Sequence, residues 1–406
     1  METYGRSNKF AMAEIPSEQE RYLFIDLFRG AAILFMLQGH TFRALLDPAI
    51  QQNPTYQFFE LFHGITAPAF LFGAGLTFVI STKKRWREYH HIGPPLFQRI
   101  GRMMLVVFLG VALHLPYLSL RKIVADGTTE DYLQLFQFDI LHCIGIGLLA
   151  LQGLIFFFKR ERRFYGLVLV STAVVPLLTP LVWDIDLLRY YPPIIAQIFN
   201  AKHGSPFPLF PFVGFLFVGV IVSWEFLRAL ERNEEASFFR RLVWLGPLIA
   251  FVALLLDAQP VQLYPTYNFW YTSPNYFAIR VGALLLLTAA FWYGSRLIGN
   301  ISAVNKSVDR AARAVTLLGK ESLLVYVVHL PILYGSVTNE GVYIQKILGN
   351  HLDLGQTVLM FLVVLLSMGF LAKAWNTLKV RYRLAYRSTQ LLVVAVFLYV
   401  FLTHAY

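Results

Sequence analysis

The sequence predicts an all-α protein, a polytopic helical bundle with about ten or eleven membrane-spanning helices. Two observations support this fold class. Hydrophobic residues make up 57% of the 406 residues and charged residues only 15%, which is too apolar for a soluble domain of this size. Apolar runs near the roughly 20 residues that a helix needs to cross a bilayer recur along the chain. They cover 24–45, 61–81, 99–119, 139–158, 165–183, 208–226, 242–257, 276–297, 322–336, 356–374 and 389–404.

Three of these runs are shorter than a comfortable crossing, namely 242–257, 322–336 and 389–404. A short apolar helix can also be re-entrant or lie at the membrane surface. The number of spans therefore depends on what these three runs do.

The connections between the runs alternate in charge. The connections 46–60, 120–138, 184–207, 258–275 and 337–355 carry at most two Lys or Arg each, whereas the others are basic. Loops rich in Lys and Arg stay on the cytoplasmic side, so we expect a cytoplasmic N-terminus and an external C-terminus. The basic positions are Lys83, Lys84, Arg85, Arg87, Lys159, Arg160, Arg162, Arg163, Arg228, Arg232, Arg240, Arg241, Arg296, Lys306, Arg310, Arg313, Lys373, Lys379, Arg381, Arg383 and Arg387.

The net charge of +11 follows from these loops, because basic residues anchor cytoplasmic loops to anionic lipid headgroups. Membrane lipids are therefore expected partners, and nucleic acid is not needed to explain the charge. Residues 1–23 are polar and lack the apolar core of a signal peptide, so we expect a short cytoplasmic tail. Neither a repeat of fixed period nor a long linker divides residues 24–406, which predicts a single transmembrane domain.

The motifs of several other protein classes are missing from the sequence. The single cysteine, Cys143, excludes an intramolecular disulfide and a C-x-x-C metal pair. The sequence has no P-loop, the usual motif of ATP-driven transport, and no H-E-x-x-H, the usual motif of zinc proteases. No metal is therefore expected. The Gly-rich stretches FLFGAGL at 70–76 and CIGIGLL at 143–149 lie inside apolar runs, which favours a role in helix packing.

The first apolar run carries three ionisable residues on one stripe. In IDLFRGAAILFMLQGH, residues 25–40, the helical direction of His40 is within about 20° of that of Arg29, and Asp26 precedes Arg29 by one turn. The stripe rises roughly 16 Å from Arg29 to His40, from near the cytoplasmic face to near the outer one. An ionisable residue at depth is costly unless it faces a partner, water or the bundle interior. For Asp26 and Arg29 alone, a structural ion pair explains the pattern equally well.

Other ionisable residues fall at the outer level of His40 when the spans are projected from this topology. They are Arg43, Glu60, His63, His114, Asp139, His142 and Arg280. His329 lies deeper, with Ser322 and Tyr326 on its helical face. A catalytic or transport cavity predicts such a cluster, although scattered interfacial polar residues would produce part of it. Histidine accepts and returns protons near neutral pH, which suggests proton-transfer chemistry.

Six stretches resemble motifs of a known family. RYLFIDLFRGAAILFMLQGH at 21–40 is similar to the first-helix signature of the transmembrane acyltransferase superfamily, in which His follows an Asp-x-x-Arg motif. The chain also resembles the bacterial membrane proteins grouped with the catalytic domain of heparan-alpha-glucosaminide N-acetyltransferase, and more distantly the acyltransferase-three family. The other stretches are HGITAPAFLFGAGLTF at 63–78, FDILHCIGIGLLAL at 138–151, PFPLFPFVGFLFVG at 206–219, YTSPNYFAIRVGALLL at 271–286 and LGKESLLVYVVHLPIL at 318–333.

This resemblance implies transfer of an acyl group, with acetyl as the default, from cytoplasmic acyl-CoA to a glycan or similar acceptor at the outer face of a bacterial inner membrane. It implies that His40 is the catalytic histidine and Arg29 the inner-face arginine. One departure matters, because in the glucosaminide enzyme the position of His40 is not histidine and the catalytic histidine lies in the following loop. His63 is therefore the second candidate. Ser322 and His329 resemble the late S-L-x-x-Y-x-x-H helix of the family.

The chemistry of a thioester suggests a role for each candidate residue. The protein must supply a base for the acceptor hydroxyl or amine, donors for the oxyanion, and orientation. We expect His40 to be the base, and Arg280, Arg43 or His142 to stabilise negative charge, with Asp139 orienting His142.

The acidic head of CoA would need cations near the cytoplasmic face. The predicted donor-binding residues are Arg29, Asp26, Arg99, Arg102 and His329. Anchoring to lipid headgroups explains Arg99 and Arg102 at least as well.

A proton-coupled secondary transporter or flippase is the alternative function, with the same cluster as its substrate site. Pro206, Pro208 and Pro211 would suit the broken helices of transporters, but the sequence has no evident inverted repeat. A transporter should neither bind nor consume CoA. A non-catalytic scaffold would leave the alignment of Arg29 with His40 without a reason. The sequence does not identify the acceptor. It also does not decide between direct attack of the acceptor on the thioester and a route through an acyl-histidine intermediate, or whether the chain forms a homo-oligomer.

Overall fold

The computed structural model describes residues 22–261, 263–264, 267–302, 305–339 and 341–404. In this part of the chain the secondary structure is helical, and the one β feature is an isolated parallel bridge between Leu46 and Leu352. The predicted all-α fold class is confirmed. Most of the predicted N-terminal tail, residues 1–21, lies outside the described residues.

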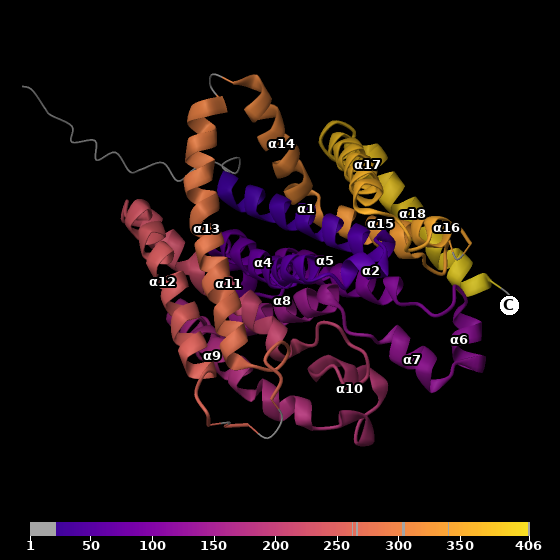
Figure 1. Ribbon diagram of the computed structural model, residues 1–406, viewed down its shortest axis with the longest axis horizontal. Coiled ribbons are helices and arrows are strands. Elements are labelled where there is room, and N and C mark those ends of the chain that lie inside the picture. Colours follow the sequence, from indigo (N-terminus) through magenta and orange to yellow (C-terminus); the bar gives the residue numbers. More distant parts are fainter. Residues whose placement is uncertain (1–21, 262, 265–266, 303–304, 340, 405–406) are drawn as a thin grey trace, which may run out of the picture.

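The chain forms a bundle of long and short helices (Figure 1). Their bounds are α1 Leu23–Leu45, α2 Pro48–Gln51, α3 Pro54–His63, α4 Thr66–Lys83, η1 Glu88–His90, α5 Pro94–Leu113, α6 Leu120–Asp126, α7 Thr129–Leu135, α8 Ile140–Phe157, α9 Glu161–Asp184, η2 Leu187–Arg189, α10 Pro193–Phe199, α11 Leu209–Glu231, α12 Glu235–Asp257, α13 Pro274–Ser302, α14 Lys306–Lys320, α15 Ser322–Tyr334, α16 Ile344–Leu348, α17 Leu354–Arg381 and α18 Arg383–Thr403.

Within the described residues, 10 helical segments are long and apolar enough to cross a membrane, and a bent pair raises the number to 11. This agrees with the prediction. The runs 242–257 and 389–404 are parts of the full-length helices α12 and α18, whose polar first turns shortened the apolar signal. The run 322–336 is the short helix α15, which meets α14 at an angle of 80°.

Contacts between loops sort the helix ends into two sets. One set carries the basic loops and is called the basic end. There Lys83 pairs with Glu231, Trp86 donates to the carbonyl of Lys159, and Arg296 pairs with Glu235.

The opposite set is called the far end. Here Leu46 pairs with Leu352, and Ser119 donates to the carbonyl of His404. Successive spans therefore run in opposite directions, as the alternating loop charges predict. In Figure 1, α14 at the top and α6, α7 and α10 at the bottom mark the two ends.

The basic connection before α15 forms a helix of its own, α14, which packs closely on the first half of α1. Gly30 of α1 lies against the backbone of Val315, and Gly319 of α14 lies against the backbone of Asp26. A Cβ atom at either glycine would overlap a carbonyl oxygen of the other helix. The two glycines therefore allow the close approach that brings the start of α15 beside Arg29.

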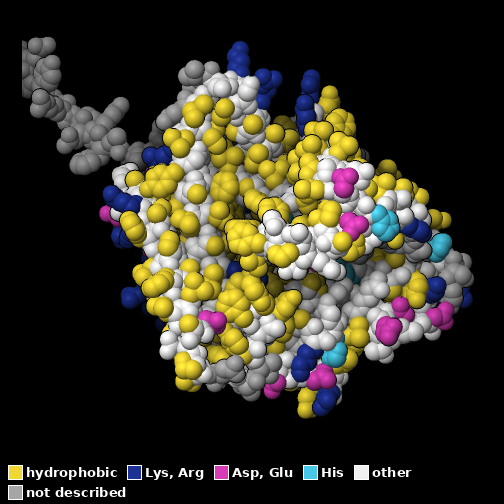
Figure 2. All heavy atoms as spheres, viewed as in Figure 1, with side chains coloured by type: hydrophobic (Ala, Val, Ile, Leu, Met, Phe, Trp, Pro, Cys, Tyr) yellow, Lys and Arg dark blue, Asp and Glu magenta, His cyan; other side chains and the backbone are white. Residues whose placement is uncertain are grey.

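The centre of the bundle consists of α1, α4 and α11, which bury most of their inner faces, whereas α18 has no buried residue. Gly75 of α4 and Gly219 of α11 face each other's backbones, at Leu216 and Phe72. The predicted packing role of the glycines in FLFGAGL is thus confirmed at Gly75. On the face drawn in Figure 2, hydrophobic side chains cover α12 and α13, as expected for a surface in contact with lipid.

Candidate functional site

Two cavities inside the bundle meet end to end. The basic-end cavity has a volume of about 220 Å³ and the far-end cavity about 450 Å³. Phe70 of α4, Ile140 of α8 and Tyr326 of α15 line both cavities, and these three residues are called the septum. The two cavities are therefore neighbours, and side chains of three different helices belong to both linings.

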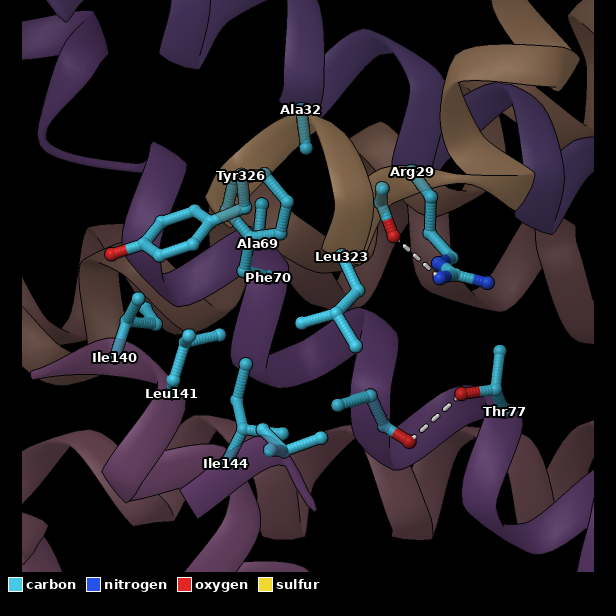
Figure 3. Close-up of a pocket in the computed structure, with 13 residues that line it drawn as sticks. Arg29, Ala32, Ala69, Phe70, Thr77, Ile140, Leu141, Ile144, Leu323 and Tyr326 are labelled. Atoms are coloured by element: carbon cyan, nitrogen blue, oxygen red, sulfur yellow. Dashed lines mark hydrogen bonds between the residues drawn. The ribbon is translucent and has the colours of Figure 1, made fainter. Parts of the chain in front are cut away.

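Arg29 and Ser322 form the polar end of the basic-end cavity. The Arg29 Nη2 atom donates a hydrogen bond of 2.7 Å to Ser322 Oγ (Figure 3). The rest of the lining is mostly apolar, with Ala32, Ala69 and Leu323 among its residues, and Thr77 adds a hydroxyl. In Figure 3 the Arg29 guanidinium and the Tyr326 ring lie on opposite sides of this space. The cavity is thus narrow and apolar, with a cation at its basic end.

Asp26, predicted to accompany Arg29, is buried one turn earlier on α1. The bend between α14 and α15 places Ser322 at the first position of α15. Glu321, immediately before it, is buried and pairs with Lys379 of α17 at 3.2 Å. The bend is therefore tied to a second helix, which holds Ser322 in place opposite Arg29.

His40 lines the far-end cavity, and its hydrogen bonds indicate its tautomer. The Tyr334 hydroxyl donates to the backbone carbonyl of His40 at 2.9 Å, so its oxygen can only accept from the imidazole. Nδ1 of His40 lies 3.4 Å from that oxygen. This arrangement favours the proton on Nδ1 and leaves Nε2 with a free lone pair, as a general base requires.

His63 lines the same cavity, but both of its ring nitrogens face protein groups. Nε2 lies 2.7 Å from the side-chain oxygen of Gln38, and buried Nδ1 lies 3.5 Å from Glu60 without a hydrogen bond. Glu60 in turn pairs with Arg43 at 2.7 Å. Gly39 provides the space for the His63 ring, since a Cβ there would lie 2.6 Å from Cδ2 of the ring. His63 is therefore held more firmly than His40.

Arg280 also lines the far-end cavity, one to two turns into α13. Its guanidinium lies over the Tyr276 ring, 3.9 Å from the ring centre. Its Nε is buried and has no hydrogen-bond partner among the described residues. A buried donor of this kind is ready to bind an anion.

His329 lies beside His40 rather than beside Arg29. The two rings are 5.2 Å apart, and His329 is fully buried. Its Nδ1 donates to the carbonyl of Val325 at 2.9 Å, and no described residue hydrogen bonds to Nε2. His329 lines neither cavity, and its predicted role in donor binding stays a prediction.

Asp139 and His142 form a second cluster, apart from both cavity linings. The Asp139 carboxylate caps the N-terminus of α8, because it accepts from the backbone N–H of His142 at 3.0 Å. The same carboxylate lies 2.7 Å from Nδ1 of the His142 ring. His114, which follows the last residue of α5, lies 3.9 Å from the same carboxylate. The histidines predicted at one outer level therefore lie in two separate places, His40 and His63 on the far-end cavity and His114 and His142 beside Asp139. The catalytic roles of Asp139 and His142 stay predictions.

Arg99 and Arg102 behave differently from each other at the basic end. Arg99 is buried, donates to Thr82 at 2.5 Å, and stacks on the rings of Phe78 and Tyr89. Arg102 is exposed on α5. Neither lines the basic-end cavity, so their predicted contact with the donor is also untested by the cavity geometry.

An aromatic rim surrounds the far-end cavity. Phe207 and Phe212 line it from around the start of α11, and Trp270 and Tyr271 from the loop before α13. The loop that leads to Phe207 is tied by His203, which lies 2.8 Å from Asp186. That hydrogen bond holds the pKa of Asp186 below its ordinary value of 3.8, so the tie is present at neutral pH.

Several residues of the site carried no strong signal in the sequence. Gln38, Phe70, Trp270 and Tyr334 are ordinary residues of apolar runs or loops, and only their position in space gives them a role. A polar residue inside a membrane helix was a usable signal for Gln38. No group of three or more His, Cys, Asp or Glu that could hold a metal occurs among the residues described.

A family model described as heparan-alpha-glucosaminide N-acetyltransferase, catalytic, matches residues 21–254, more than half of the chain. The match includes α1 with Arg29 and His40, α3 with His63, and also α4 and α8, whereas α13 and α15 follow it. No curated protein is significantly similar to the chain.

Proposed function

Because the chain belongs to the heparan-alpha-glucosaminide N-acetyltransferase catalytic family, we propose that it transfers an acetyl group from acetyl-CoA to an acceptor across the membrane. Membership implies a membrane acetyltransferase-like activity. The donor would enter at the basic end, which is cytoplasmic by the positive-inside rule, and the acceptor at the far end. The observation that carries this proposal is the pair of cavities that meet at the septum, with Arg29 in one and His40 in the other.

The basic-end cavity suits the donor. Its narrow, apolar shape fits an extended pantetheine arm, and Arg29 at its polar end provides a charged donor for the amide or phosphate groups of CoA. The basic loops at the same end supply further positive charge for the acidic head. In this arrangement the thioester would lie at the septum.

His40 would act as the base for the acceptor. Its Nε2 takes the proton from the acceptor hydroxyl or amine while the acceptor oxygen or nitrogen forms a bond to the acetyl carbon. The carbon–sulfur bond then breaks, and the proton on His40 passes to the leaving thiolate. General base catalysis of this kind contributes about 100- to 10,000-fold to a rate.

Tyr326 is our choice for stabilising the oxyanion. Of the three septum residues it alone has a hydrogen-bond donor, and its hydroxyl belongs to the layer where the thioester carbonyl would lie. Arg280, which the sequence suggested for this role, lines the far-end cavity but not the basic-end one.

The acceptor would be a glycan or a related hydroxyl or amine compound. The aromatic rim of Phe207, Trp270 and Tyr271 offers the flat apolar faces on which sugar rings stack. The cytoplasmic membrane of a bacterium is the setting that the family resemblance favours.

The first test is release of free thiol from acetyl-CoA by the purified protein in nanodiscs, with and without a mixed pool of glycan acceptors. We expect His40→Ala to lower acceptor-dependent release about 100- to 10,000-fold, with CoA binding retained. His63→Ala is the matched control and should lose less activity.

Normal turnover in His40→Ala would move the catalytic role to His63. If the wild-type protein neither releases thiol nor binds CoA in calorimetry, the acetyltransferase proposal fails. That result would favour the transporter alternative.

A further inference from the structure

A third cavity, called the lateral groove, opens beside the far-end cavity and has a volume of about 600 Å³. It lies between α1, α3, α12 and α13, and its lining is almost entirely apolar. Several lining side chains, including Phe62 and Leu286, are apolar and exposed at the surface of the helical bundle, where lipid is expected. The groove is therefore open to the lipid phase, and its volume is typical of a ligand site.

The lateral groove is continuous with the far-end cavity. Phe35, Gly64, Thr66, Trp270 and Arg280 line both spaces. A molecule that lies in the groove can therefore extend into the cavity that contains His40 without leaving the protein. A groove filled only by bulk lipid would not need this connection.

Arg280 is the one charged residue among those that line the groove, and it lies at the junction. It is six residues from the start of α13, or roughly 9 Å along the helix axis. This depth is near the headgroup level, where Trp and Tyr side chains such as Trp270 and Tyr276 are also typical. Its buried, unpartnered Nε and the absence of a carboxylate among the groove residues favour an anionic group at this point.

We propose that the acceptor is lipid-anchored: its hydrocarbon tail lies in the lateral groove, the phosphate that links tail to glycan binds Arg280, and the glycan reaches His40 in the far-end cavity. This inference rests on the proposed function and specifies its acceptor class as a phosphate-linked glycolipid. An apolar tail next to a single cation matches the distribution of charge in the groove. The aromatic rim would then hold the sugar.

The activity test compares two acceptors with the same sugar. One is N-acetylglucosamine linked to farnesyl diphosphate, and the other is its soluble methyl glycoside. Ala283→Trp fills the groove on α13, and Ala31→Phe fills it from the opposite wall on α1. Ala290→Trp, at an exposed position of α13 outside the groove lining, is the matched control.

We expect each groove variant to lower the ratio of lipid-linked to soluble transfer at least about tenfold, since losing the burial of two methylene groups has an effect of this size. The control should keep the wild-type ratio. Arg280→Gln should raise the KM for the lipid-linked acceptor more than the KM for the soluble one, because only the lipid-linked acceptor carries a phosphate. An equal loss of kcat with both acceptors would instead make Arg280 an oxyanion stabiliser and overturn its assignment to the phosphate.

A binding test separates this inference from the proposed function, because it needs no turnover. A photo-crosslinkable farnesyl phosphate should label α1 or α13 of the wild type and of Ala290→Trp, and label the groove variants much less. Unlabelled farnesyl phosphate should compete, whereas farnesol should compete at least tenfold less well. Equal competition by farnesol, or equal labelling of Ala283→Trp and Ala31→Phe, would show that the groove holds bulk lipid only and would overturn the proposal even if acetyl transfer is found.

Discussion

Replacing Tyr334 with Phe tests the reasoning about the tautomer of His40. The Tyr334 hydroxyl gives its proton to the His40 carbonyl and so must accept from Nδ1. Without that hydroxyl, the Nδ1–H tautomer loses its stabilising partner. A neutral hydrogen bond contributes about 0.5–1.5 kcal/mol, and 1.36 kcal/mol corresponds to a factor of ten in rate. Since the Nδ1 contact is long, at 3.4 Å, we expect kcat to fall about 2- to 10-fold.

The assay is a double-mutant cycle with acetyl-CoA turnover as the readout. Tyr334→Phe, His40→Ala and the combination are compared at saturating acceptor, with Tyr293→Phe on the exposed side of α13 as control. Because Tyr334 acts through the imidazole, its replacement should cost nothing further once His40 is absent. CoA binding should be the same in all four proteins.

Two results would refute this account. If Tyr334→Phe lowers the residual turnover of His40→Ala by the same factor as it lowers wild-type turnover, Tyr334 does not act through His40. If it changes only the KM for the acceptor, the hydroxyl contacts the acceptor rather than the base.

Two further predictions concern the basic half of the bundle. Arg29→Ala should weaken CoA binding about 10- to 100-fold in calorimetry, since a charge-assisted hydrogen bond contributes about 1.5–3 kcal/mol, whereas removal of exposed Arg387 should not; equal affinities would exclude Arg29 from the donor site. Gly30→Ala should lower the free energy of unfolding by about 1–3 kcal/mol, because its Cβ would overlap the backbone of Val315, and thermal unfolding in detergent measures this. Gly294→Ala, which has open space around it, is the control, and identical midpoints would show that the α1–α14 crossing adapts without cost.

The fold was predictable from the sequence because a bilayer imposes a fixed length and composition on each span. The helix ends were predicted less well, because polar residues in a first turn, such as Glu235 on α12, lie outside the apolar run. The helix α14 was missed for the same reason, since its basic face is typical of a cytoplasmic loop. A helix that lies along the membrane surface, or that meets the next helix at a steep bend, does not show the long apolar run of a straight membrane crossing.

The candidate site was predictable only in part. The helical stripe that joins Arg29 to His40 is a property of one helix, so it can be inferred from spacing alone. Whether two helices bring their histidines together depends on the angle at which the helices cross and on which faces meet. The residue pattern of one helix does not determine either. His63 therefore lies with His40 on one cavity, while His142, at the same predicted depth, faces α5 instead.

The septum of Phe70, Ile140 and Tyr326 also has a bioenergetic consequence. A continuous water column through the bundle would conduct protons and discharge the membrane potential, which stores about 2.3 kcal/mol per charge at 100 mV. Two of the three septum side chains have no hydrogen-bonding atom, so these two side chains cannot relay protons between the cavities when no substrate is bound. In the proposed reaction, an acetyl group would thus pass from one compartment to the other without an open water path for ions.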